Sequence, residues 1–370
     1  MIPVTPRGFK DVLPEEARIR EQLGRKASDV LDLWGYDPIE TPALEVLDVL
    51  EQGSKVDKAT FRLFDHDDNL LVLRPDVTLP IARMVASRLS GEEGPFRFRY
   101  DLPVFRDNES SKGSSREFTQ IGIEQIGLGG HAADAETIVV FVESLMACGL
   151  DDFKIEFCNV QVLENLLEAC GMGEEFDHAV LSAYHASNHV KLDNVVDASD
   201  ASPELAACLK RLIRIHGGRE AISECSDLLR GYVDESVFDE LLATWDIIDS
   251  CGYSSHVGVD FSLLSSFDYY TGVIFEAYSP GIGASIGGGG RYDNLLEVFG
   301  RRMPAAGFAF SLDGLMHALS VQGNLVAEPR EIDSIDVSGS EGSVEAESEA
   351  FSRAMELHAQ GRAAFLGGAR

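Results

Sequence analysis

In Arg116-Glu117-Phe118-Thr119-Gln120-Ile121-Gly122-Ile123-Glu124, polar and apolar residues alternate. Successive side chains of a β-strand point to opposite faces, so this period predicts a strand with Gln120, Gly122 and Glu124 on one face. That face carries an amide, a position without a side chain, and a carboxylate. The gap at Gly122 predicts room for a small ligand, held on either side by Gln120 and Glu124. The stretch is therefore expected to form the floor of a polar small-molecule site.

The bulk composition is that of a globular chain long enough for two domains and smaller pieces, with 370 residues, 45% hydrophobic and 25% charged. The sequence contains no run of about 18 apolar residues, so it predicts no membrane span. Met1–Thr5 lacks the pattern of a signal peptide. The six cysteines form no C-x-x-C pair. They are expected to be reduced thiols in a cytoplasmic protein.

The charge balance bears on possible partners. The chain has 62 acidic against 31 basic residues, a net charge of -31. Nucleic-acid backbones are bound by clustered Lys and Arg. The balance therefore argues against a nucleic-acid partner unless one face is locally basic, and by itself it identifies no substrate.

The first part of the chain predicts antiparallel strand pairs rather than a βαβ series. Pro14, two glutamates and a stopping Gly35 indicate a helix over Pro14–Trp34. The other expected elements are an extended segment over Gly35–Glu45, a hairpin of Phe61–Phe64 with Leu70–Leu73, a helix over Thr78–Leu89, an alternating strand from Phe96, a helix over Ala133–Cys148, and a strand over Phe153–Phe157.

The rest of the chain divides by composition. Residues 160–248 are expected to be a helical insertion, between two parts (1–159 and 249–328) of one core. Residues 329–370 are expected to be a linker and a small β-α-β remnant, with Ser338–Ser348 as a mobile connection. The expected later elements are strands Val257–Phe261, Val273–Tyr278 and Ala284–Gly287, a strand and helix over Pro304–Val321, strand Ile332–Val337, helix Ala350–Gln360 and strand Ala363–Leu366.

Over roughly residues 5–320, these segments in this order resemble the catalytic core of histidyl-tRNA synthetase, a class II aminoacyl-tRNA synthetase fold. That fold is α+β: an antiparallel sheet flanked by helices. No P-loop motif is present. The segments that carry the resemblance are Leu73-Arg74-Pro75-Asp76-Val77-Thr78, Phe105-Arg106 through Glu124, Asp268-Tyr269-Tyr270-Thr271-Gly272-Val273-Ile274-Phe275-Glu276, and Gly289-Gly290-Arg291-Tyr292-Asp293.

The resemblance implies a histidine pocket. Acceptors for the ligand's ammonium group would be Asp76, Thr78 and Gln120. Arg106 would pair with its carboxylate. Glu124 and Tyr270 would take the two imidazole nitrogens, with Tyr269 alongside. A zwitterion with an imidazole needs such a set, and charge-assisted contacts are worth about 1.5–3 kcal/mol each.

The sequence departs from the synthetase pattern where ATP chemistry would need cations. Ser265-Ser266 stand where an Arg-Gly pair is expected, Gly314 and Ser114 stand at expected arginines, and Asn108 replaces a glutamate. Activation by ATP builds charge on phosphate, and losing one donor of this kind typically costs about 10²–10³ in rate. An anticodon-binding domain is also not expected in the 41 residues (370 minus 329) after Pro329.

A core with histidine contacts but without those ATP contacts resembles the regulatory subunits of ATP phosphoribosyltransferase, a paralogous family. The resemblance implies a non-catalytic chain that activates a short catalytic subunit and mediates histidine feedback at the first step of histidine biosynthesis. It also implies a homodimer within a larger hetero-oligomer, through Gly35–Glu45, with no tRNA partner and no cofactor.

Other interpretations remain open. The chain could be a divergent synthetase or amino-acid ligase, or a free-standing histidine sensor. Gln120, Glu124 and Arg106 could be structural polar groups, and Gly287–Gly290 could permit only a tight bend or a strand contact. His185 and His189, four apart on a predicted helix, have the spacing of a metal pair, but no carboxylate or cysteine at matching spacing supports one.

Overall fold

The computed structural model describes residues 4–53, 60–107, 115–264, 267, 269–329, 331–337 and 343–367. Two compact units divide the chain, Met1–Leu325 and Val326–Arg370. We call them the core unit and the tail unit.

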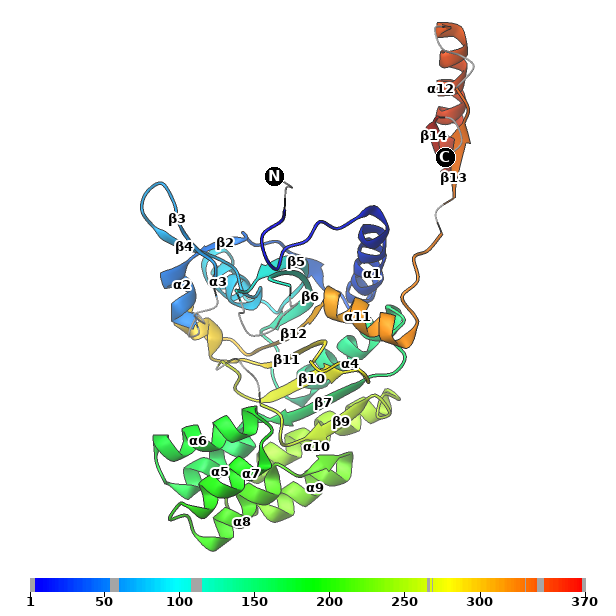
Figure 1. Ribbon diagram of the computed structural model, residues 1–370. Helices are drawn as coiled ribbons and strands as arrows, with labels where there is room; N and C mark the ends of the chain where they lie inside the picture. The colour runs from blue at the N-terminus through cyan, green and yellow to red at the C-terminus, as the bar shows by residue number, and fades with distance from the viewer. Residues whose placement is uncertain are drawn as a thin grey trace. The chain divides into compact units, whose positions relative to one another are not determined.

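A large, mainly antiparallel sheet forms the centre of the core unit (Figure 1). Within the described residues it has nine strands, and two neighbouring pairs, β1–β5 and β7–β9, run parallel. In spatial order the strands are β1 (Asp37–Pro38), β5 (Phe96–Phe105), β6 (Glu117–Ile126), β12 (Ala305–Ser311), β11 (Gly287–Arg291), β10 (Val273–Tyr278), β7 (Lys154–Asn159), β9 (Val257–Asp260) and β8 (His216–Gly217). The predicted strand over 116–124 is thus confirmed as β6, between β5 and β12.

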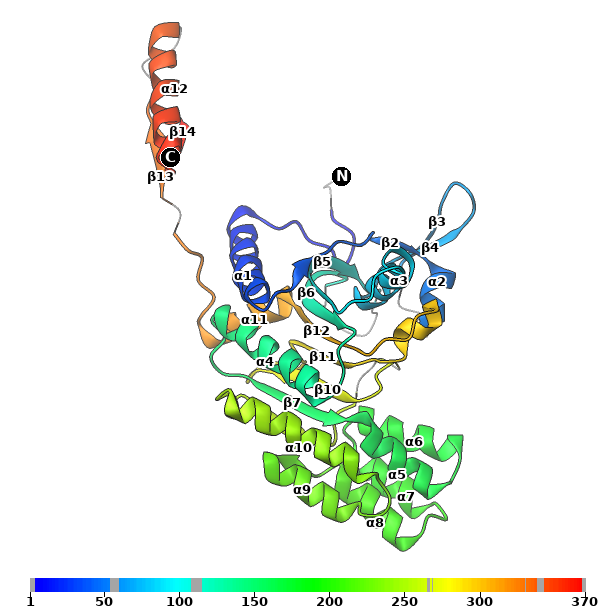
Figure 2. The ribbon, with the colours of Figure 1, turned by 180° about the vertical axis from the view of Figure 1, so that it is seen from behind.

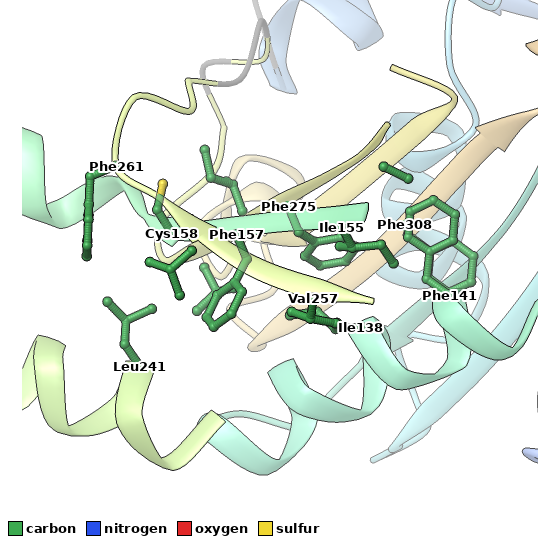
Figure 3. Close-up of a cluster of buried hydrophobic side chains, with 14 of the residues drawn as sticks. Ile138, Phe141, Ile155, Phe157, Cys158, Leu241, Val257, Phe261, Phe275 and Phe308 are labelled. Atoms are coloured by element: carbon green, nitrogen blue, oxygen red, sulfur yellow. The ribbon is translucent and has the colours of Figure 1, made fainter. Parts of the chain in front are cut away.

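Three helices, α1 (Pro14–Leu33), α4 (His131–Ala147) and α10 (Glu235–Ser250), pack side by side across one face of this sheet (Figure 2). Their apolar side chains meet those of the strands, as Figure 3 shows for Ile138 and Phe141 of α4 and Leu241 of α10. The rings of Phe141 and Phe308 stack with centroids 4.7 Å apart. This burial fixes the sheet and leaves its other face available for a site.

A second, three-stranded sheet stands beside the first in the order β2 (Leu44–Val46), β4 (Leu70–Leu73), β3 (Arg62–Phe64). Strands β3 and β4 form the predicted hairpin. Its turn is held by Asp65, whose Oδ1 accepts from the backbone of Asp67 and Asn69, each at 2.9 Å. Helices α2 (Leu47–Gly53) and α3 (Thr78–Arg88) and the 3-10 helix η1 (Leu295–Phe299) share a second apolar core with β5.

Between β7 and β9 the chain is mostly helical, as predicted. The helices are α5 (Val160–Cys170), α6 (Glu174–His185), α7 (His189–Asp197), α8 (Pro203–Leu212), α9 (Arg219–Leu228) and α10. The prediction that His185 and His189 share one helix is wrong. α6 ends at His185, Ser187 takes a left-handed φ of 45°, and a new helix starts at His189 after the cap Asn188.

The expected strand over Ala284–Gly287 is also wrong, because the strand is β11, Gly287–Arg291. A Cβ at Gly289 would lie 2.0 Å from the carbonyl oxygen of Gly307 on β12, and one at Gly290 would lie 2.9 Å from the ring of Tyr270. The glycine run is therefore a strand whose close neighbours leave no room for side chains. Strand β12 then leads into α11 (Leu312–Gln322).

The tail unit is the predicted β-α-β remnant. β13 (Ile332–Ile335) and β14 (Ala363–Leu366) run parallel and are joined through α12 (Val344–Ala359). The helix begins earlier than expected, because Ser343 caps it by accepting from the backbone of Ala346 at 3.4 Å. Residues 344–348 are therefore helical rather than a connection, and 338–342 lie outside the described residues.

Two predictions from composition can be compared with the structure. Across the described parts of the chain, no helix combines the length and apolarity needed to cross a bilayer. All six cysteines are free thiols, and four of them are buried.

Candidate functional site

A cavity of about 470 Å³ lies over strands β6, β12, β11 and β10 of the core unit. It brings together all the residues that the sequence predicted for ligand binding, although they come from four separate segments of the chain. These residues are Asp76, Thr78, Arg106, Gln120, Glu124, Tyr269 and Tyr270.

The floor strand departs from the prediction in one respect. Gly122 pairs directly with Tyr100 of β5, and a Cβ at position 122 would lie 2.7 Å from the Tyr100 hydroxyl. The gap is thus filled by a tyrosine ring and is not room for a ligand. The physical reason is register: which side chain fills a glycine gap depends on the residue across the ladder.

Glu124 is the most deeply buried polar group of the cavity, with 1% of its surface exposed. Its Oε1 accepts from the hydroxyls of Thr78 at 2.7 Å and Tyr100 at 3.3 Å. Its Oε2 accepts from the hydroxyl of Tyr292. Burial raises the pKa of Glu124 to about 8, although these three hydrogen bonds oppose the rise. The carboxyl group is therefore fixed in place, with a pKa well above the ordinary value of a glutamate.

Asp76 stands at the entry to α3, where its Oδ1 accepts from the backbone N–H of Leu79 at 3.0 Å. The segment before it is anchored by Arg74, whose Nε donates to the carbonyl of Pro103 at 2.8 Å and whose Nη1 donates to that of Thr41 at 2.6 Å. Burial raises the pKa of Asp76, and the Leu79 N–H and the charge of Arg106 oppose the rise. The Arg-Pro-Asp run thus aims a carboxyl group into the cavity.

Arg106 is the one cation among the described residues that line the cavity. Its Nε donates to the carbonyl of Pro75 at 2.8 Å. Its guanidinium lies 5.3 Å from the ring centre of Phe118 and 5.9 Å from that of Phe267. A guanidinium held in this way suits a ligand carboxylate.

Tyr269 and Tyr270 enter the cavity from the segment before β10, with ring centres 4.8 Å apart. Burial raises the pKa of both hydroxyls, so they stay protonated and can donate. Gln120 also lines the cavity, and its buried side-chain oxygen accepts from no described residue of the chain. The inner part of the cavity therefore offers carboxyl groups, hydroxyls, an amide and one cation.

The outer part of the cavity has a different character. By this part we mean the lining residues Gly287, Gly288, Ser311, Glu276 and Asp313, all of which are partly exposed. Asp313 accepts from Arg20 of α1 at 2.8 Å, and Ser311 caps α11 by accepting from the backbone of Gly314 at 3.2 Å. Gly314, a predicted departure, thus carries no side chain toward phosphates. The other departures, at 108, 114, 265 and 266, lie outside the described residues.

Sequence reasoning missed the two tyrosines that hold Glu124. Tyr292 is part of the motif Gly289–Asp293, but the motif alone does not predict which of its side chains point into the cavity. The neighbouring Arg291 points away from it. The Nε of Arg291 donates to buried Asp134 at 2.8 Å, on α4. Tyr100 was visible only as part of an alternating strand. Its role follows from its pairing with Gly122.

Comparison with known proteins places the chain among related sequences. A family model of histidyl-tRNA synthetases matches residues 8–315. The ATP phosphoribosyltransferase regulatory subunit of Moorella thermoacetica is 38% identical over 315 residues, which span 85% of this chain and 81% of that protein. The corresponding Bacillus subtilis protein is 37% identical over 333 residues, 89% of this chain and 84% of that protein.

A solved structure leads to the same group. The crystal structure of an ATP phosphoribosyltransferase regulatory subunit/histidyl-tRNA synthetase from Bacillus halodurans C superposes with a TM-score of 0.89 at 32% identity. The match covers 99% of this chain and 93% of that one. The predicted class II synthetase-like fold is therefore confirmed.

Proposed function

The chain belongs to the ATP phosphoribosyltransferase regulatory subunits, within the histidyl-tRNA synthetase fold family, and on that premise we propose that it activates a short catalytic subunit and mediates histidine feedback inhibition. The chain itself carries no catalysis in this proposal. The partner performs the ATP and phosphoribosyl chemistry.

The observation that carries the proposal is the convergence of the seven predicted residues on one cavity. Arg106 and Asp76 offer opposite charges for the carboxylate and the ammonium group of an amino acid. Glu124 and Tyr270 both line the cavity, and in this proposal they take the two ring nitrogens of the histidine side chain. Few amino acids other than histidine need a carboxyl group and a phenol hydroxyl at the side chain.

The outer part of the cavity favours regulation over ATP-dependent activation. Phosphoryl chemistry needs cations aimed at the phosphate oxygens. The described residues there include two carboxylates, Glu276 and Asp313, and Asp313 already engages Arg20. A triphosphate placed at this end would meet like charge, whereas a free amino acid at the inner end would not.

We also propose the division of labour within the chain. Residues 1–159 and 249–328 form the histidine-binding core, 160–248 form an insertion, and 329–370 form a linker and remnant.

A homodimer forms within the hetero-oligomer. Its support is an aliphatic face on the small sheet, where Leu44, Val46 and Leu63 are 40%, 42% and 37% exposed and lie on the same face. A face of this kind is typical of an interface.

Histidine acts in this proposal by favouring a less active arrangement of the partner. Coupling between two sites is typically about 1–3 kcal/mol, which is enough for strong feedback. The test is phosphoribosyl-ATP formation by a short catalytic subunit, with and without this chain, and then with histidine. Activation that histidine reverses is the expected result.

Variants at Glu124 separate binding from assembly. Glu124→Ala should abolish histidine inhibition and leave assembly intact. Glu124→Ala leaves three hydroxyl groups without their acceptor. Glu124→Gln is therefore the matched variant, because it keeps the shape of the side chain. If a competent partner is not activated at all, the regulatory proposal fails, and histidine-dependent pyrophosphate exchange would then reveal a synthetase.

A further inference from the structure

The inner end of the cavity holds two buried carboxyl groups, Asp76 with 5% and Glu124 with 1% of the surface exposed. Both accept hydrogen bonds, Asp76 from a backbone N–H and Glu124 from hydroxyls. Within the parts of the chain that the structure describes, no Lys, Arg or His comes within ion-pair distance of either group. A buried carboxylate without a cation is costly.

The elements packed against Glu124 contribute neutral groups and two charged ones, Asp76 and Arg106. The groups that face it are Thr78 of α3, Tyr100 of β5, Tyr292 after β11, Tyr269 and Tyr270 before β10, Asp76 before α3, and, beyond Asp76, Arg106 after β5. Burial raises the pKa of all four tyrosines, so their hydroxyls stay neutral. Around Glu124 the charged groups are therefore two acids, Asp76 and Glu124 itself, and the cation Arg106, while the carboxylates Glu276 and Asp313 line the outer part of the cavity.

A zwitterionic ligand does not balance this inventory. Its carboxylate matches Arg106 and its ammonium group matches Asp76, which leaves Glu124 opposite the side chain. Glu124 can accept a further hydrogen bond, because Oε2 receives one described hydroxyl while Oε1 receives two. A positively charged side chain supplies both the donor and the missing charge.

We propose that the cavity binds histidine in its imidazolium form, with the charged ring paired to Glu124, and that it selects ligands carrying this second positive charge. The proposal rests on the proposed histidine binding and adds the charge state of the ligand. Thr78, Tyr100 and Tyr292 are then positioning residues, because they hold the carboxylate that recognises the ring.

The proton for the ring has a source within the cavity. Near neutral pH the free ring is mostly neutral, since its ordinary pKa is about 6.5, and burial raises the pKa of Glu124 to about 8. On binding, the Glu124 O–H bond breaks and a ring N–H bond forms, which gives a carboxylate and an imidazolium without net proton exchange. Below about pH 6 binding releases one proton, and above about pH 8 it takes one up.

Calorimetry in pairs of buffers with different ionisation enthalpies counts these protons. We expect release of about one proton near pH 5.5, almost none near pH 7, and uptake of most of one proton near pH 8.5. Glu124→Gln is the matched control, since uptake due to the ligand's ammonium group persists in it. Equal uptake by both proteins near pH 8.5 would overturn the proposal, whereas greater uptake by the unaltered protein shows that the bound pair holds one shared proton, on the carboxyl group or on the ring.

A second measurement decides where that proton lies, and it also covers the case in which Glu124→Gln binds no histidine. ¹⁵N-labelled histidine bound to the unaltered protein should show a proton on both ring nitrogens at pH values where the free ring carries one. A single ring N–H in the bound state would refute the charged form while leaving histidine binding intact. Absence of binding at every pH would instead overturn the proposed function itself, so the two failures are distinguishable.

Discussion

Tyr100 of β5 lies directly across from Gly122 of β6, and its hydroxyl donates to Glu124, two residues beyond Gly122 on β6. A glycine on the floor strand thus makes room for the residue that holds the central carboxyl group.

Gly122→Ala should therefore disturb both folding and the site. The added Cβ would lie 2.2 Å from the carbonyl of Phe308 and 2.7 Å from the Tyr100 ring. Overpacking of this kind typically costs about 1–3 kcal/mol, and we expect a lower urea midpoint together with weaker histidine binding. Gly91→Ala is the control, since a Cβ there meets nothing within 4 Å. Equal midpoints for the two variants would show that Tyr100 can move away freely.

The buried ion pair of Arg291 and Asp134 gives a prediction about stability alone. Arg291 donates through Nε at 2.8 Å, and both residues are buried. Arg291→Met leaves a carboxylate stranded between β11 and α4, and we expect a loss of about 3–5 kcal/mol in the free energy of unfolding. Adding Asp134→Asn should recover part of that loss.

Chemical denaturation of these variants measures the effect. The control is Arg25→Met, which breaks an exposed pair with Glu21 and should barely move the midpoint. If Arg291→Met is as stable as the double variant, the unpaired carboxylate of Asp134 does not reduce the free energy of unfolding, which would contradict this prediction.

The sequence predicted elements wherever a local pattern was strong. Strand β6 and helix α3 follow from alternation and from a helix start at Thr78. Strand β11 could not be placed, because four successive glycines carry no pattern and only the neighbouring strands make them a strand. The alternation of residues within one strand does not predict which residue lies across from each of them on the neighbouring strand.

The site shows the same limit. The seven binding residues predicted from the motifs all line the cavity. The residues that support them, Tyr100 and Tyr292, act through contacts with Glu124 that span 24 and 168 positions of the chain. Such contacts depend on strand order and register, which a single sequence does not encode in any local signal.

Titration of Glu124 predicts how stability depends on pH. Burial raises its folded pKa to about 8, while an unfolded glutamate titrates near about 4.3. Between these values the folded state binds more protons than the unfolded state, so this group's contribution to stability falls as pH rises. Glu124→Gln does not titrate, and it should raise the melting temperature relative to the unaltered protein near pH 8 more than near pH 5.

Thermal unfolding of the ligand-free proteins at both pH values checks the sign. Glu21→Gln serves as the control, because the Glu21 side chain is 70% exposed and its effect should be nearly the same at both pH values. A Glu124→Gln difference that does not change with pH would mean that the carboxyl group is ionised throughout this range.

Arg106 gives the sharpest prediction on ligand recognition, because its expected partner is one group of the ligand. A charge-assisted hydrogen bond is worth about 1.5–3 kcal/mol, so Arg106→Met should weaken histidine binding about 10- to 100-fold. Histamine lacks the carboxylate, and its weaker binding should be nearly unchanged by the same substitution. Arg99→Met is the matched control, since Arg99 pairs with Asp32 at 2.6 Å and does not line the cavity. Calorimetric titration of both ligands into the three proteins measures the four ratios. Equal losses for histidine and histamine would place Arg106 in the structure of the cavity wall, through Pro75, rather than opposite the ligand's carboxylate.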